Sequence, residues 1–296
     1  MQATGAACTG SPWAEIVRVD PVSLNNALIV LVIVAVGGLM LHPRVAGARL
    51  WQATITPLAS IIGSGFLVIG PILDASFGVW APVVMAVLCA GAYLFGSAIR
   101  FNIGHADDRG TTGDHLETAA SWALAFAYVI SVAYYLNLLG AFAVRLTTLD
   151  DAYHARLVTS GALLLILITG WSYGFRALER MEQVTVGIKL AIIAGLLSGL
   201  AWYFAERAGT GSLVTNPATV TGWPAVTLIF GLIVTVQGFE TSRYLSADYD
   251  APLRIRSMRL AQWLSTVIYL TYIVLLAYVF ERGTLEFDET AIIGMM

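Results

Sequence analysis

Long apolar segments, separated by short polar ones, repeat along the whole chain. They cover residues 26–41, 51–73, 79–100, 118–144, 157–173, 184–205, 223–245 and 260–280. Each is close to the ~20 residues that a helix needs to cross the hydrocarbon core of a bilayer. The pattern predicts an all-α integral membrane protein with about eight transmembrane helices and a polar amino-terminal tail at residues 1–22.

The composition agrees with this prediction and argues against several kinds of partner. Hydrophobic residues make up 58% of the chain and charged residues 12%, with a mean hydropathy of +0.77, whereas about 25% of residues are charged in soluble domains. The formal charge is −3 and no basic tract is present, so no nucleic-acid partner is expected. Cys8 and Cys89 are far apart and the histidines lack ligand spacing, so neither a metal centre nor a cofactor is expected.

The first apolar segment, residues 26–41, could be a membrane helix or the core of a secretory signal. A signal has a basic start close to its apolar core, but the residues that precede this segment carry little net charge. Ala46-Gly47-Ala48 could mimic a cleavage site. We favour a retained transmembrane helix at residues 23–42.

The arginines indicate how these helices are oriented. With the amino terminus outside, ten arginines, Arg100 among them, lie on the inner side and five on the outer side. Because cytoplasmic loops carry the excess of basic residues, an outside amino terminus is predicted. The loops at residues 101–116 and 246–259 then face the cytoplasm, and the segment 51–73 enters the membrane from that side.

The apolar stretch at residues 56–72 carries residues that interrupt a helix. Gly63-Ser64-Gly65 lies at its middle, and Pro57 and Pro71 lie near its ends. A helix broken there would free main-chain N–H and C=O groups at the membrane midplane, where such groups are tolerated only if they are buried in protein or line a cavity. The stretch therefore indicates a ligand site. Small residues in a membrane helix more often form a close-packed face, and that alternative stays open for this stretch alone.

The segment 223–245 repeats this feature. Its middle contains residues that weaken a helix, with a carboxylate beside them: Gly231, Thr235, Gln237, Gly238 and Glu240. Five helix steps separate the two interrupted segments, so they cross the membrane in opposite directions. Paired interruptions of this kind are typical of transporter sites, which favours a ligand site over packing alone.

Several motifs resemble those of the amino acid/polyamine/organocation (APC) permeases. Ile62-Gly63-Ser64-Gly65-Phe66 resembles the signature in the first core helix of that family, and Gly238-Phe239-Glu240 is similar to the motif in its sixth core helix. The loop from Ala247 to Pro252 and the segment from Gly174 to Leu190 are similar to further features of the family. The resemblance runs from about residue 51 to residue 282.

The resemblance implies the inverted-repeat (LeuT-like) transporter fold, with five helices in each half. It assigns residues 51–205 to the first repeat and residues 223–282 to the first two helices of the second, and leaves 283–296 as a tail or truncation point. The second repeat would then be truncated, as in a permease that is incomplete at its carboxyl end. The helix at 23–42 has no counterpart in the simplest form of that fold.

The two interruptions together predict a binding site built mainly from backbone. The helix that begins after Gly63-Ser64-Gly65 would attract a carboxylate with the positive end of its dipole, and glycine lets the backbone approach closely. Free carbonyls around residues 234–236 would face an α-amino group. The predicted substrate-binding residues are Ile62, Gly63, Ser64, Gly65, Val234, Thr235, Val236 and Gly238.

Lys189 and Glu240 are the ionisable acidic or basic residues within the apolar segments proper. Each costs roughly 2.5 to 3.5 kcal/mol at a helix centre, so each needs a physical reason. Glu240 could pair with Arg243, hydrogen-bond the freed main chain, or handle substrate or protons. Lys189 could snorkel to the interface. The resemblance implies instead that it takes the place of a sodium ion beside the first break, as in some proton-coupled members of the family.

These features favour a secondary transporter of amino acids or related amines that works by alternating access around two broken helices. The expected partners are a small-molecule substrate, membrane lipid and, as a candidate coupling ion, the proton. A non-transporting sensor or accessory subunit is the alternative. An intramembrane enzyme using Glu240 is less favoured, because the apolar segments contain no nucleophile and base pair and no paired carboxylates. No enzymatic activity is expected, and the expected location is the plasma (inner) membrane.

Overall fold

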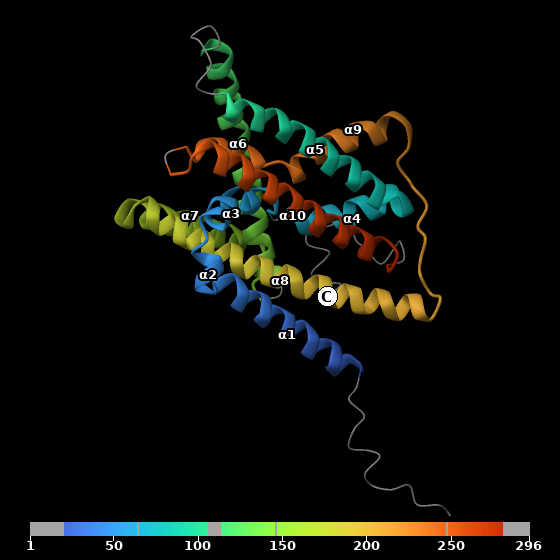
Figure 1. The fold of residues 1–296 in the computed structure, drawn as a ribbon. Helices are drawn as coiled ribbons and strands as arrows, with labels where there is room; N and C mark the ends of the chain where they lie inside the picture. The colour runs from blue at the N-terminus through green and yellow to red at the C-terminus, as the bar shows by residue number, and fades with distance from the viewer. Residues whose placement is uncertain (1–20, 64, 106–113, 146, 247, 281–296) are drawn as a thin grey trace, which may run out of the picture.

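The computed structural model describes residues 21–63, 65–105, 114–145, 147–246 and 248–280. Within these ranges the chain forms helices and no strand (Figure 1). The α-helices are α1 (Pro21–Leu41), α2 (Pro43–Ala46), α3 (Arg49–Ile61), α4 (Gly65–Phe77), α5 (Ala81–Gly104), α6 (Asp114–Arg145), α7 (Ala152–Tyr173), α8 (Phe175–Gly209), α9 (Gly222–Leu232) and α10 (Ala251–Ala277). Short 3-10 helices are η1 (Gly78–Trp80), η4 (Ile233–Val236) and η5 (Phe239–Tyr244). The predicted all-α membrane class is confirmed.

Seven helical segments within the described ranges are long and apolar enough to cross a membrane. One of them, residues 65–104, is 40 residues long and includes both α4 and α5. Hydropathy predicted about eight membrane helices. The difference arises at the first break, where α3 and α4 have only 13 residues each. A helix of that length rises only ~20 Å, less than the ~30 Å hydrocarbon core. The helices α3 and α4 therefore correspond to two halves of one interrupted span.

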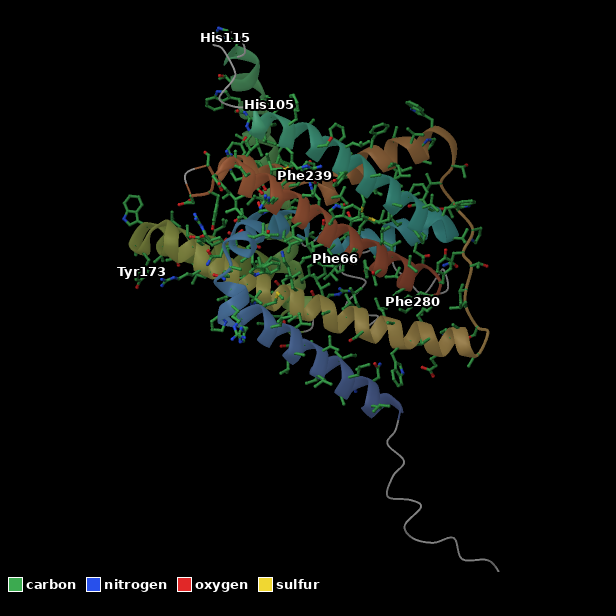
Figure 2. All side chains as sticks on the ribbon, viewed as in Figure 1. Phe66, His105, His115, Tyr173, Phe239 and Phe280 are labelled. Carbon is green, nitrogen blue, oxygen red and sulfur yellow. The ribbon has the colours of Figure 1, made fainter. Side chains whose placement is uncertain are left out.

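The core of the bundle lies around α10, which packs against α3, α4, α5 and α8. Tyr269 and Tyr272 of α10 are fully buried, and their rings contact that of Phe66 on α4 at centroid distances of 5.4 and 4.6 Å. Figure 2 shows Phe66 in the interior of the bundle. Aromatic pairs of this kind add roughly 0.5 to 1.5 kcal/mol beyond their burial, so α10 anchors the half-helix that follows the first break.

The outer faces of α1, α6 and α7 are apolar and exposed. Side chains such as Leu31, Phe126 and Leu165 each leave more than half of their surface uncovered by the chain (65%, 69% and 58%). Apolar surface on this scale is not stable in water. These faces are suited to contact with lipid, as the membrane class requires.

Several helices extend beyond the apolar segments that predicted them. Helix α10 begins at Ala251 rather than near residue 260, because Asp250 takes the N-cap position and Pro252 fits the first turn. The expectation of a loop over residues 251–259 is therefore wrong. Arg100, counted with the inner arginines at the end of its segment, lies within α5 and is buried. Hydropathy marks the apolar part of a helix, whereas the polar turns that continue it are fixed by capping and packing.

Hydrogen bonds join α2, α3, α8 and the loop before α10 at one end of the bundle. The side-chain amides of Gln52 and Gln183 donate to the Ala46 carbonyl at 3.0 and 2.9 Å. The hydroxyl of Tyr249 donates to the Glu179 carboxylate at 3.3 Å. Burial, together with that carboxylate, raises the pKa of Tyr249 to about 12, so the hydroxyl keeps its proton and can donate near neutral pH.

We expect this end of the bundle to face the cytoplasm. In a background with Cys8→Ser and Cys89→Ala, Asp250→Cys and Asp108→Cys should react slowly with a membrane-impermeant thiol reagent in intact cells and rapidly after permeabilisation. Asp250 directly precedes α10, whereas Asp108 lies outside the described residues. Asp150→Cys, in the turn between α6 and α7 on the opposite side of the predicted topology, is the matched control and should react rapidly in intact cells. Rapid labelling of the first two variants in intact cells would contradict the topology.

Candidate functional site

The first interruption lies between α3 and α4, where Gly63-Ser64-Gly65 predicted it. Helix α3 ends at Ile61, Ile62 has a non-helical ψ of 72°, and α4 begins at Gly65. Ser64 itself lies outside the described residues. The Phe66 N–H donates to the Gly63 carbonyl at 3.2 Å, so a single tight turn joins the two half-helices.

The second interruption lies between α9 and α10. Helix α9 ends at Leu232, η4 continues it with 3-10 geometry, Gln237 is extended with a ψ of 177°, and η5 begins at Phe239. Gly238 has a φ of 114°, a left-handed value that glycine adopts without the strain other residues meet. The α-helical path of this segment is therefore broken at residues 233–238, and the side chain of Phe239 that follows lies inside the bundle (Figure 2).

The two interruptions are in contact. A Cβ atom on Gly238 would lie 2.5 Å from the Ser60 Oγ of α3, so the absence of a side chain allows this approach. Tyr269 of α10 joins the two breaks, because its hydroxyl oxygen lies 3.0 Å from the Ile61 carbonyl oxygen and 2.8 Å from that of Thr235. Segments that are far apart in the sequence therefore form one polar centre inside an apolar bundle.

One carbonyl group of η4 has a hydrogen-bond donor within reach. The Thr235 carbonyl oxygen lies 2.8 Å from the Tyr269 hydroxyl oxygen, whose single proton it shares with the Ile61 carbonyl. Because a carbonyl oxygen has two lone pairs, the role of Thr235 in binding an amine stays a prediction. The Thr235 hydroxyl donates to the Leu232 carbonyl at 2.7 Å. The methyl group of Thr235 would lie 3.7 Å from a Cβ atom on Gly65, which places η4 directly beside the start of α4.

Lys189 reaches the first break from α8. Its ammonium donates to the Ala59 carbonyl at 3.2 Å and to the Ile62 carbonyl. The side chain therefore points to the end of α3 and does not snorkel to the interface. Carbonyls at a helix carboxyl end lack intrahelical partners and carry the negative end of the dipole, so a cation at this point stabilises the broken end.

Glu240 is buried and hydrogen-bonded within the second break. Its carboxylate accepts the Gly238 N–H at 2.9 Å through Oε2 and the Tyr128 hydroxyl at 2.9 Å through Oε1. The bond to Gly238 is the main-chain contact that was one of the alternatives for this residue. Tyr128 belongs to α6, so Glu240 links the second break to a third helix. Tyr128 was not predicted as a site residue, since tyrosines are common in membrane helices and its partner is remote in sequence.

A cavity of about 280 Å³ opens beside the two interruptions. Its lining comes from α3, α6 and the two breaks, and consists of Ala59, Ser60, Gly63, Tyr128, Ser131, Val132, Tyr135, Gln237 and Gly238. Cβ atoms on Gly63 and Gly65 would lie 3.5 Å from the ring of Tyr135, which therefore forms the wall opposite the first break. Hydroxyl and amide groups without a carboxylate or ammonium in the lining are suited to hydrogen-bonding a small polar molecule.

Three further acidic or basic side chains make hydrogen bonds between segments and were not predicted as site residues. Each hydrogen-bonds to a neutral polar side chain of another segment. The pairs are Asp74 with Asn216 at 3.2 Å, Arg100 with Gln262, and Glu182 with Thr56 at 3.0 Å. All three lie at or within two residues of the end of an apolar segment, so hydropathy marked them as ends of membrane segments although their helices continue.

Comparison with known proteins shows the family. The family model described as APC superfamily transporter matches residues 43–296. The chain belongs to the APC superfamily of transporters. It is also 39% identical over 263 residues to an uncharacterized protein of Aquifex aeolicus (strain VF5), a match that covers 86% of this chain and 64% of the relative. The chain thus spans about two thirds of that relative's length, and no solved structure matches it.

The family match confirms the resemblance seen in the two motifs and establishes a multi-pass membrane protein of a transporter family. The match begins at residue 43, so it includes both interruptions, the cavity and Lys189. Helix α1, which ends at Leu41, lies outside the matched region.

Proposed function

We propose that this APC superfamily protein moves amino acids or related amines across the plasma (inner) membrane by alternating access around its two broken helices. The observation that carries the proposal is the contact between the two breaks beside a polar cavity, with the Tyr269 hydroxyl within hydrogen-bond distance of one carbonyl from each. Gly63 and Gly238 border a cavity of about 280 Å³, which supports a binding role in addition to the close packing of Gly238 against Ser60.

In this proposal the substrate carboxylate binds at the amino end of α4 and its amine binds near η4. Helix α4 begins at Gly65, and a helix amino end offers unpaired N–H groups to an anion. The amine would meet carbonyls around Val234, Thr235 and Val236, of which that of Thr235 also lies near the Tyr269 hydroxyl. Ile62, Gly63, Ser64 and Gly238 would supply the remaining backbone of the site.

Lys189 and Glu240 take coupling or gating roles in this proposal. Lys189 holds the end of α3 through two carbonyls, so loss of its proton would weaken the contact between α3 and α8. Glu240 joins the second break to Tyr128 of α6, which lines the cavity. In this proposal the proton on Lys189, rather than a sodium ion, links the position of α3 to the transport cycle.

The backbone role of the glycines predicts a specific order of variants. Gly63→Val or Gly65→Val should lower substrate binding more than about tenfold while leaving the protein folded, because the added methyl groups extend towards Tyr135 and the cavity. Ser64→Ala should have a milder effect. Binding is measured with labelled amino acids on purified protein, and folding by thermal stability in detergent. If both valine variants bound substrate as wild type does, the packing interpretation would hold.

Uptake into proteoliposomes tests the transport function itself. Saturable accumulation of a labelled amino acid, absent from protein-free vesicles, is the expected result. Binding without flux would instead favour the sensor or accessory subunit. The same preparation assayed for turnover of the substrate in detergent tests the enzyme alternative.

A further inference from the structure

Helix α1 packs along the outer face of α8 through a row of small residues. On α8 these are Gly187, Ala191, Gly195 and Gly199, which are spaced four residues apart. Figure 1 shows α1 running beside α8. At ~100° per residue, the row lies on the side of α8 roughly opposite to Lys189.

The contacts along this row are close. A Cβ atom on Gly195 would lie 2.5 Å from Cγ1 of Ile33, and one on Gly199 would lie 2.9 Å from Cδ1 of Ile29. Gly37 of α1 would bring a Cβ atom to 3.6 Å from that of Ala191. Small residues allow two membrane helices to approach in this way, so the interface depends on the missing side chains.

The chain then turns around the end of α8. Helix α2 follows α1, and its Ala46 carbonyl accepts the amide of Gln183 on α8 and that of Gln52 on α3. Helix α3 continues on the inner side of α8, where Thr56 donates to Glu182 and Lys189 donates to the end of α3. Helix α8 is therefore held between α1 on one side and α3 on the other.

We propose that α1, α2 and α3 form a clip around α8, and that α1 keeps the contact between α3 and α8 closed next to Lys189. Helix α1 is covalently joined to α3 through α2. Movement of α3 away from α8 must therefore strain the hydrogen bonds to the Ala46 carbonyl or shift α1 along the row of small residues on α8. The family match begins at residue 43, so α1, the part of the clip on the outer face of α8, lies outside the matched region. Gly195, Gly199 and Gln183 are positioning residues in this arrangement.

The test measures how fast a cysteine between α3 and α8 becomes accessible, so it does not depend on whether or what the protein transports. The reporter is Thr56→Cys in a background with Cys8→Ser and Cys89→Ala, labelled by an impermeant thiol reagent from the cytoplasmic side of inside-out vesicles. Every variant carries this reporter, so the loss of the Thr56–Glu182 bond is common to all the rates compared. Gly195→Leu should speed labelling about tenfold, because overpacking displaces α1. Gln183→Met, which removes the bond to Ala46, should speed it less. Gly38→Leu is the matched control on α1, since a Cβ atom there meets nothing within 4 Å, and should leave the rate unchanged.

A second pair of variants guards against misfolding. Gly195→Ala should speed labelling, and Ile33→Ala in the same chain should restore the slow rate, because it removes the atoms that the new methyl group would meet. Rescue of this kind would not follow from a general loss of stability. The proposal is overturned if Gly195→Leu or Gly195→Ala gives monodisperse protein that labels as slowly as Gly38→Leu, or if Ile33→Ala fails to restore the rate.

Discussion

Lys189→Met is expected to lower the initial rate of solute uptake about a hundredfold, which corresponds to roughly 2.7 kcal/mol. The side chain keeps its length but loses the donors that bind the Ala59 and Ile62 carbonyls. A buried acceptor left without a partner costs about 1 to 3 kcal/mol, so the end of α3 would be displaced from α8. Uptake of a labelled amino acid into proteoliposomes measures the loss, and Gly231→Ala, on α9 with nothing near its added Cβ atom, is the matched control.

The proton role of Lys189 is tested separately from its structural role. Uptake by wild type should need no sodium and should depend on pH, whereas Lys189→Arg should keep the contact with α3 but lose the pH dependence, because arginine does not release its proton. Glu182, two turns earlier on α8, is a charged group that interacts with Lys189. The pH dependence of uptake must therefore also be measured for Glu182→Gln. A strict sodium requirement, or an arginine variant with the pH profile of wild type, would contradict the proposal.

The positions of the two interruptions could be predicted from the sequence, because helix-weakening residues cluster in the middle of an apolar run at both places. The contact between them could not be. It depends on Tyr269 and on the approach of Gly238 to Ser60, which join segments far apart in the chain. Local sequence contains the reason for each break but not the geometry that joins them.

The orientation of Lys189 shows the same limit. Helix rise alone made snorkelling plausible, because the cytoplasmic end of the helix is close. The acceptors that hold the ammonium lie on α3, 127 and 130 residues away, and periodicity does not say which face of α8 they meet. Only the family resemblance indicated the first break as the target. The contact of α1 with α8 is different. The small residues of α8 that meet α1 are spaced four apart, and this spacing is visible in the sequence once the partner helix is known.

Gly238→Ala is expected to cost roughly 2 to 6 kcal/mol of stability and to abolish uptake. Two effects combine. A residue with a side chain is strained at a φ of 114°, which costs of order 1 to 3 kcal/mol, and the new methyl group would lie 2.5 Å from Ser60 Oγ and 2.6 Å from its main-chain carbon, which adds an overpacking cost of similar size. Because the second contact is with backbone, no rotation of the Ser60 side chain relieves it, and the two breaks must separate.

Two other glycine variants separate the effect of backbone strain from that of the close contact with Ser60. Gly222→Ala has a positive φ of 66° but meets nothing within 4 Å, whereas Gly231→Ala has neither a positive φ nor a close neighbour. Thermal unfolding in detergent should therefore rank Gly231→Ala near wild type, Gly222→Ala lower, and Gly238→Ala lowest, with uptake lost only in the last. Equal losses of stability for Gly222→Ala and Gly238→Ala would mean that backbone strain alone acts. Uptake retained by Gly238→Ala would mean that transport does not need the contact between the two broken helices.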